Sequence, residues 1–188
     1  SKEKIHIFDT TLRDGAQTQG VDFSIDDKLK IAKALDDLGV DYIEGGWPGA
    51  NPTDTEFFQK KIKLNNSVLT AFGMTKRSGR SADNDPGLSS ILNSNTSAVC
   101  LVGKSWDFHV DVALGISNEE NLENISESAK LFVKEKKEFM FDAEHFFDGF
   151  KNNKEYALSC VKSAYDNGAR WIVLCDTNGG TLPNEVSE

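Results

Sequence analysis

A segment able to do chemistry lies near the amino terminus, where residues 8–15 read FDTTLRDG. It begins as a short apolar strand, then brings Asp9, Arg13 and Asp14 close together before a glycine turn. At the end of a buried strand, this arrangement would supply a fixed cation beside a hard oxygen ligand for a metal. The alternative is a solvated loop with a surface ion pair, which would contribute little to stability.

Polar groups also follow three later apolar runs. Glu44 ends the second run and is expected to hold Arg13 in place, although it could equally form a plain ion pair. In FMFDAEHFF, a carboxylate is costly unless it is paired or binds something, which favours a functional role for Glu144. We also expect Asp142, from the same segment, to contribute to substrate binding. In CDTNGG, Thr177 and the glycine amides could bind a carboxylate, or the segment is an ordinary turn.

A repeat of strand, loop and amphipathic helix must position these groups. Each predicted strand is a short apolar run bounded by turn residues, at 4–8, 42–45, 68–72, 98–103, 138–142 and 171–175. Strands spaced roughly 30 residues apart indicate right-handed βαβ units and a parallel sheet. The polar residues at the strand ends would then share the carboxyl edge of that sheet.

Capping residues predict where the helices begin and end. Ser24 and Asp27 can form a capping box, and Gly39 supplies the left-handed residue that ends the same helix. Ser117 and Glu120 open a second helix in the same way. Shorter or less clearly bounded helices are expected at 55–64, 87–92 and 156–166.

Two parallel-sheet folds compete for this pattern. A doubly wound nucleotide-binding fold would carry a GxGxxG fingerprint after the first strand, and residues 9–20, DTTLRDGAQTQG, do not match it. A (β/α)8 TIM barrel instead places its chemistry at the carboxyl ends of several strands. Such a barrel needs eight units and roughly 250 residues. We therefore expect residues 1–188 to be the amino-terminal part of a single TIM-barrel catalytic domain, truncated after strand six, with about six βα units.

Composition argues against several functions. With 21 Lys and Arg against 30 Asp and Glu, the net charge is −9, so we expect no nucleic-acid partner. The absence of a long apolar run and of a signal peptide predicts a soluble, cytoplasmic protein without a membrane partner. Cys100, Cys160 and Cys175 are predicted to be buried free thiols. Residues 76–80 could meet phosphates or form a solvated basic loop.

Several segments together resemble a known enzyme group: FDTTLRDGAQ, YIEGGWPGANPTD, GKSWDFHV, FDAEHFFDG and LCDTNGGTLP. They are similar to the Claisen-type synthases that join acetyl-CoA to a 2-keto acid, in the superfamily of isopropylmalate and homocitrate synthases called the DRE-TIM metallolyases. DTTLRDG is specific for the superfamily, whereas GKSWDFHV and DAEHFFDG point to the (R)-citramalate synthases.

The resemblance implies a role for individual residues. Asp14 matches the ligand of a divalent metal, Mg, Mn or Zn, and Arg13 matches the arginine that stabilises a developing enolate or alkoxide oxygen. Glu144 matches a strand-five glutamate near the reacting centre, and Thr177 matches the threonine that binds the keto-acid carboxylate. Gln17 occupies a position close to metal and substrate.

The implied enzyme is an acyltransferase that makes (R)-citramalate and CoA from acetyl-CoA and pyruvate, for isoleucine biosynthesis, as a homodimer. One alternative is a 2-isopropylmalate synthase or a related enzyme that uses a larger 2-keto acid. Another, of a different class, is an inactive fragment or binding module, because the His-x-His metal ligands of the group are absent from these 188 residues.

Overall fold

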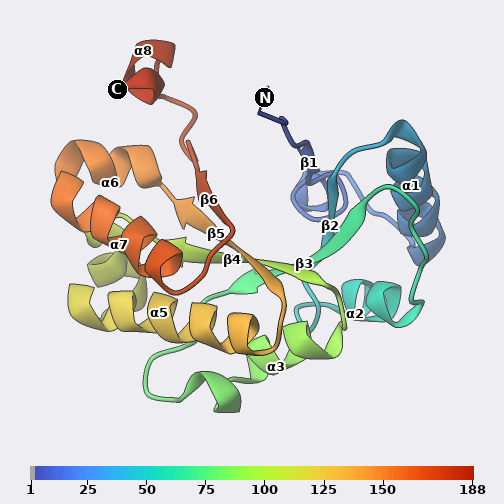
Figure 1. Ribbon diagram of the computed structural model, residues 1–188, viewed down its shortest axis with the longest axis horizontal. Coiled ribbons are helices and arrows are strands. Elements are labelled where there is room, and N and C mark those ends of the chain that lie inside the picture. Colours follow the sequence, from blue (N-terminus) through green and yellow to red (C-terminus); the bar gives the residue numbers. More distant parts are fainter. Residues whose placement is uncertain (1–2) are drawn as a thin grey trace. The chain divides into compact units, whose positions relative to one another are not determined.

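The computed structural model describes residues 3–188, along which strands and helices alternate (Figure 1). All six strands belong to one sheet and are hydrogen-bonded in the order in which they occur in the chain. They are β1 (Phe8–Asp9), β2 (Tyr42–Gly46), β3 (Val68–Met74), β4 (Ala98–Lys104), β5 (Glu138–Glu144) and β6 (Trp171–Leu174). A doubly wound sheet would reverse its strand order at a switch point, whereas a barrel keeps it sequential. The six strands and the helices between them therefore form part of a (β/α)8 barrel, as predicted.

The chain divides into two compact units. The first comprises residues 3–73 together with 89–100, and the second comprises 74–88 together with 101–188. In the first unit, β2 pairs in parallel with β1 and β3, and the register shifts between Glu44 and Gly46. The first unit also contains η1 (Gly15–Gln17), α1 (Ile25–Leu38) and α2 (Pro52–Gln59), and it shares α3 (Pro86–Asn93) with the second.

The second unit contains most of the helices. Here β5 pairs in parallel with β6, with Met140 opposite Trp171. The helical elements are η2 (Ala82–Asn84), α4 (Asp107–His109), the π-helix η3 (Val110–Leu114), α5 (Asn118–Lys134), α6 (Phe146–Asn152), α7 (Lys154–Asp166) and α8 (Pro183–Ser187). Sequence patterns did not reveal η2, α4, η3, α6 or α8, which are short.

The predicted caps are confirmed. Ser24 and Asp27 form the reciprocal capping box of α1, and Gly39 ends that helix with a φ of 86°. The Ser117 side chain accepts the Glu120 backbone N–H at the start of α5, which is one half of the predicted capping box. These contacts lie within four residues of one another, so the local sequence is sufficient to specify them.

Several predicted boundaries were wrong. The strands predicted at 68–72 and 138–142 each run two residues further, to Met74 and Glu144, and the helix predicted at 156–166 begins two residues earlier, at Lys154. The first strand is Phe8–Asp9 instead of 4–8, because Ile5 and Ile7 are exposed rather than packed in the sheet. The helix expected at 55–64 is Pro52–Gln59, and it begins after the Asn51 cap. It cannot extend to 64, because Lys61 has a φ of 48°, which is incompatible with a right-handed helix. The last strand ends at Leu174, one residue early.

Each unit has its own apolar core. Ile43, Ala71 and Val99 are fully buried in the first unit, and Phe132 and Phe141 are fully buried in the second. Fully burying a Val, Ile or Phe side chain stabilises a fold by roughly 1.5–3 kcal/mol relative to leaving it exposed.

The cysteines follow the prediction only in part. Cys100 and Cys160 are buried, whereas Cys175 is partly exposed. Burial is the main cause that raises the pKa of Cys160 to about 12. That thiol is therefore protonated and poorly nucleophilic in the folded protein at neutral pH.

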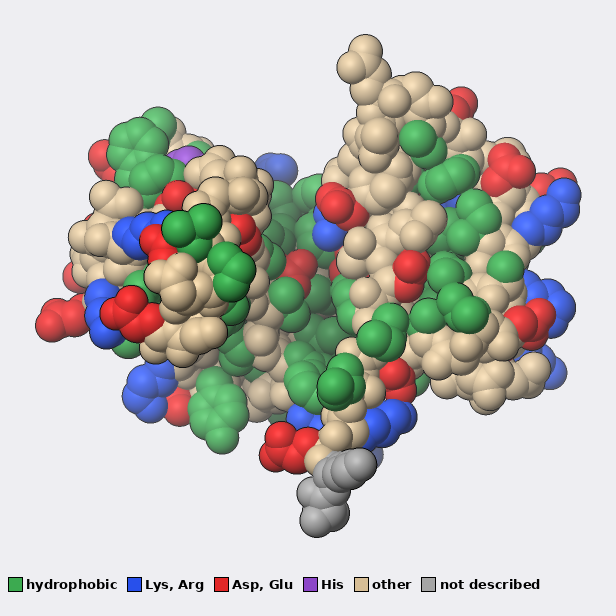
Figure 2. All heavy atoms as spheres, turned by 90° about the horizontal axis from the view of Figure 1, so that it is seen from above, with side chains coloured by type: hydrophobic (Ala, Val, Ile, Leu, Met, Phe, Trp, Pro, Cys, Tyr) green, Lys and Arg blue, Asp and Glu red, His purple; other side chains and the backbone are tan. Residues whose placement is uncertain are grey.

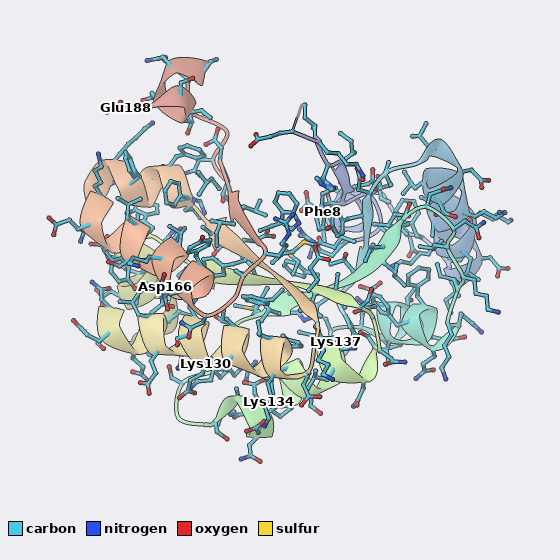
Figure 3. The ribbon with its side chains drawn as sticks, viewed as in Figure 1. Phe8, Lys130, Lys134, Lys137, Asp166 and Glu188 are labelled. Atoms are coloured by element: carbon cyan, nitrogen blue, oxygen red, sulfur yellow. The ribbon has the colours of Figure 1, made fainter. Side chains whose placement is uncertain are left out.

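The surface carries charges of both signs. Acidic and basic side chains are interspersed over the face in Figure 2, with hydrophobic side chains between them. Lys130 and Lys134 lie near the carboxyl end of α5 and Lys137 just beyond it (Figure 3), where cations complement the negative end of the helix dipole. Among residues 3–188, no helix is both long and apolar enough to cross a bilayer.

Candidate active site

The predicted site residues fall into two groups, one in each unit. The first group lies on the turn after β1, where the backbone N–H groups of Arg13, Asp14 and Gly15 all donate to the Thr10 carbonyl oxygen. Leu12, which is fully buried, anchors this turn in the core of the first unit. The turn thus presents the side chains of Arg13 and Asp14 from a fixed backbone.

Arg13 is held on two sides. Its Nε donates to Oε1 of Glu44 at 2.5 Å, and its Cζ lies 4.0 Å from the centre of the Phe72 ring. Glu44 is fully buried within β2, where a carboxylate is costly without a partner, so the guanidinium and the carboxylate stabilise each other. The expected contact between Glu44 and Arg13 is therefore present. The hydrogen bond to Glu44 and the contact with the Phe72 ring together set the orientation of the guanidinium.

Asp14 and Gln17 lie beside the same guanidinium. The Arg13 Nη1 donates to Oδ1 of Asp14 at 3.1 Å and to Oε1 of Gln17 at 3.4 Å. The Asp14 side chain is 66% exposed, so its carboxylate remains accessible to a ligand. The first group can therefore offer a fixed cation and a hard oxygen donor side by side.

A pocket of about 330 Å³ adjoins this turn. Its lining includes Arg13, Gln17, Lys28, Trp47, Asn51 and Asp54. Lys28 is almost fully buried and pairs with Asp54. The Asp54 Oδ2 also accepts the Trp47 backbone N–H at 2.8 Å and the Asn51 amide at 3.1 Å. This buried ion pair fixes one wall of the pocket.

Sequence reasoning missed the Lys28–Asp54 pair. Asn51 begins α2 by accepting the Asp54 backbone N–H, so the segment NPTD carried a recognisable cap. The lysine partner is 26 residues away in the chain, and no local pattern pointed to it.

The second group lies at the ends of β5 and β6. Asp142 is buried within β5, and Glu144, the last residue of the strand, pairs with Lys104 at the end of β4. The Ser105 hydroxyl donates to the Glu144 carbonyl oxygen at 2.7 Å. Lys104, which no sequence pattern singled out, thus supplies the cation that the apolar setting of Glu144 requires.

Thr177 meets the end of β5, as the parallel-sheet prediction required. Its Oγ1 accepts the His145 backbone N–H at 2.9 Å. The His145 ring contacts Asp148 through Nδ1 at 2.9 Å, and the Asn178 amide donates to the same Asp148 oxygen at 2.8 Å. The ends of β5 and β6 are therefore joined by a polar network around Thr177.

His109 lies beside this network. Its ring packs edge to face against the His145 ring, with 4.5 Å between the ring centroids, and its centroid lies 4.6 Å from that of the Trp106 ring. Its Nδ1 is buried and has no hydrogen-bond partner among the residues that the structure describes. Burial lowers the pKa of His109, and the nearby His145 and Lys104 lower it further. The imidazole is therefore neutral at physiological pH.

The basic segment after β3 is not uniformly solvated. Lys76 is buried: its ammonium donates to the Arg80 carbonyl oxygen at 2.9 Å and pairs with Glu127 at 3.2 Å. The expectation of a solvated loop or phosphate-binding cluster was therefore wrong for Lys76. Arg77 and Arg80 are exposed.

Similarity to known proteins covers nearly the whole chain. The HMGL-like family model matches residues 4–188. The (R)-citramalate synthase of Aquifex aeolicus is 54% identical over 188 residues, which are 99% of this chain and 36% of that protein. The (R)-citramalate synthase of Sulfolobus acidocaldarius is 50% identical over 98% of this chain and 36% of its own length. The 2-isopropylmalate synthase of the same organism is 33% identical over 97% of this chain and 45% of that protein.

A solved structure agrees with the fold. The HMG-CoA lyase of Bacillus subtilis superimposes with a TM-score of 0.78 at 17% sequence identity, over 97% of this chain and 61% of that chain. The present chain thus spans about a third of the length of the (R)-citramalate synthases it matches. On the match of the family model from residue 4 to residue 188, the chain belongs to the HMGL-like family.

Proposed function

We propose that the protein containing this chain is an acyltransferase that makes (R)-citramalate and CoA from acetyl-CoA and pyruvate. The observation that carries the proposal is the fixed guanidinium of Arg13 beside the exposed carboxylate of Asp14. The choice of substrates is supported by the higher identity to (R)-citramalate synthases than to 2-isopropylmalate synthase, 54% against 33%. It also agrees with the resemblance of the motifs around these residues.

Arg13 is proposed to stabilise the oxyanion that develops when acetyl-CoA loses a methyl proton. A base accepts that proton, and the resulting carbanion carbon attacks the keto carbon of pyruvate. The new carbon–carbon bond forms as the carbonyl π bond opens, and the keto oxygen takes up a proton. Water then cleaves the thioester and releases the CoA thiol. A cation already held by Glu44 and Phe72 needs little reorganisation as the charge appears, which is the condition for effective electrostatic catalysis.

Asp14 is proposed to be a ligand of a divalent cation, Mg, Mn or Zn. Its carboxylate is an accessible hard donor, which fits such an ion, although one carboxylate does not hold a catalytic metal alone. When bound, the cation supplies Lewis-acid polarisation of the 2-keto group. Gln17, which shares the Arg13 guanidinium with Asp14, is proposed to contact the substrate.

The second group is assigned by the same proposal. Thr177 would donate its hydroxyl to the carboxylate of the 2-keto acid, and Asp142 would contribute to substrate binding. Glu144 is proposed to act near the reacting centre, where it pairs with Lys104. Glu44 supports Arg13 without contacting substrate.

The test is the release of free CoA thiol from acetyl-CoA by the full-length protein, with pyruvate or 2-ketoisovalerate as acceptor. We expect release with pyruvate in the presence of Mg²⁺ or Mn²⁺ and none after EDTA. A preference for 2-ketoisovalerate would instead identify a 2-isopropylmalate synthase, and no release with either acceptor would refute both assignments. We also propose a cytoplasmic homodimer serving isoleucine biosynthesis, to be tested by sedimentation and by the isoleucine requirement of a deletion strain.

A further inference from the structure

The loop that carries Thr177 has little apolar anchorage. All five residues from Asp176 to Gly180 are exposed. Asp176 bonds the hydroxyl and the backbone N–H of Thr181, which shapes the loop internally. Polar bonds to α6 must therefore decide where the Thr177 hydroxyl lies.

The first of these bonds sets the direction of the hydroxyl. Oγ1 of Thr177 accepts the His145 backbone N–H at 2.9 Å. A hydroxyl that accepts one hydrogen bond keeps its own hydrogen for another acceptor. Thr177 is thus prepared to donate to an anion.

His145 is itself held in an unusual conformation. It is a non-glycine residue with a φ of 51°, a left-handed conformation that costs on the order of 1 kcal/mol. Its Nδ1 lies 2.9 Å from Oδ2 of Asp148. An ionised carboxylate can only accept, so this bond places the hydrogen on Nδ1 and holds the residue in the conformation that presents its backbone N–H.

Asp148 also holds the other side of Thr177. The Nδ2 of Asn178, the next residue in the chain, donates to the same Oδ2 at 2.8 Å. Thr177, His145, Asp148 and Asn178 therefore form a closed ring. Hydrogen bonds join Thr177 to His145, His145 to Asp148 and Asp148 to Asn178, and the chain itself joins Asn178 to Thr177. A closed ring restrains the hydroxyl more strongly than any one of its bonds.

We propose that Asp148 and Asn178 are positioning residues, which place the Thr177 hydroxyl for the carboxylate of the 2-keto acid. The inference rests on the proposed function, in which Thr177 binds that carboxylate. Neither residue touches the reacting atoms. Their removal should therefore weaken acceptor binding while leaving the handling of acetyl-CoA intact.

The test compares two asparagines that both bond Asp148. Asn178→Ala removes the bond to the carboxylate, whereas Asn152→Ala removes a bond of equal length, 2.8 Å, to the backbone oxygen of the same residue. In the full-length protein, we expect Asn178→Ala to raise the KM for pyruvate about tenfold. The KM for acetyl-CoA and kcat at saturating pyruvate should stay within twofold, as should all three values in Asn152→Ala.

Two threonine variants calibrate the response. Thr177→Val removes the hydroxyl and should raise the pyruvate KM at least as far as Asn178→Ala, whereas Thr177→Ser keeps the hydroxyl and should restore most of the affinity. If Thr177→Val leaves the pyruvate KM unchanged, the role of Thr177 in the proposed function fails. If Thr177→Val raises it and Asn178→Ala behaves like Asn152→Ala, the positioning role alone is overturned.

A readout independent of activity separates the two failures further. Amide hydrogen exchange of residues 176–181 should be about tenfold faster in Asn178→Ala than in the native protein, and unchanged in Asn152→Ala. Equal exchange in the two variants would overturn the inference whether or not the protein turns over pyruvate.

Discussion

Replacing Arg13 by lysine keeps the positive charge after β1 but removes the planar guanidinium. In the native protein, Nε donates to Glu44, Nη1 donates to Asp14, and Cζ lies 4.0 Å from the centre of the Phe72 ring. An ammonium on a flexible stem cannot satisfy these directions together. We therefore expect the cation to leave the position at which the oxyanion would develop.

The size of the loss follows from the role proposed for the guanidinium. Removing one preorganised donor from an oxyanion site lowers kcat by roughly 10²–10³, or about 2.7–4 kcal/mol. Stability should fall much less, because the lysine can still pair with the buried Glu44. Arg13→Met, by contrast, takes this cation away from a fully buried carboxylate, which costs about 3–5 kcal/mol.

The assay is kcat/KM for thiol release from acetyl-CoA, measured beside the thermal unfolding midpoint of each variant. Phe72→Leu is the matched control: it keeps Arg13 and Glu44 but removes the ring face, and should cause a smaller loss of activity than Arg13→Lys. An Arg13→Lys enzyme within threefold of native kcat/KM would refute the electrostatic role. A loss explained entirely by unfolding would make Arg13 a structural residue.

Three further substitutions test other parts of the structure. Asp14→Asn should weaken Mn²⁺ binding in calorimetry at least tenfold with little change in the metal-free melting temperature, because the side chain is 66% exposed; comparable losses in both would mark it as structural. Gly149→Ala should lower the free energy of unfolding in urea by roughly 1–3 kcal/mol, because a Cβ there would lie 2.3 Å from the Ser105 carbonyl oxygen. Gly180→Ala is the control: a Cβ there would have no atom within 4 Å, so the free energy of unfolding should not change. Backbone N–H bonds, first that of residue 65, lower the pKa of Asp36, so its folded value lies below its unfolded value. The stability that Asp36 contributes is then present above about pH 4 and is lost as the pH falls through the folded pKa. The measurement is the difference in urea unfolding midpoint between the native protein and Asp36→Asn. A difference that is the same at pH 3 as at pH 7 would contradict this prediction.

Local features of the chain were predicted well. The α1 capping box of Ser24 and Asp27, the left-handed Gly39 and the order of the strands all followed from residue types and spacing. These features depend on neighbours within a turn or on the alternation of apolar runs. Lys61 shows the limit of such reasoning, because its positive φ ended α2 without any glycine or proline to announce it.

Pairings between distant residues could be anticipated only in part. Glu44 was expected to meet Arg13 because both follow neighbouring strands, and it does. The partner of Glu144 is Lys104, which is 40 residues away and was not anticipated. Opposite charges at several strand ends allow more than one pairing, and only the register and direction of the side chains select one.

The sequence by itself determined the sequential strand order, the main helix caps and the placement of Arg13, Asp14 and Thr177 at strand ends, because these depend on local periodicity and on the geometry of parallel sheets. Only the tertiary structure decided which groups are buried and which charges they meet. It placed Phe72 against the Arg13 guanidinium and closed the ring of hydrogen bonds around Thr177. Such contacts join residues far apart in the chain, and their free energy arises from burial and directed hydrogen bonds that exist only once the chain has folded.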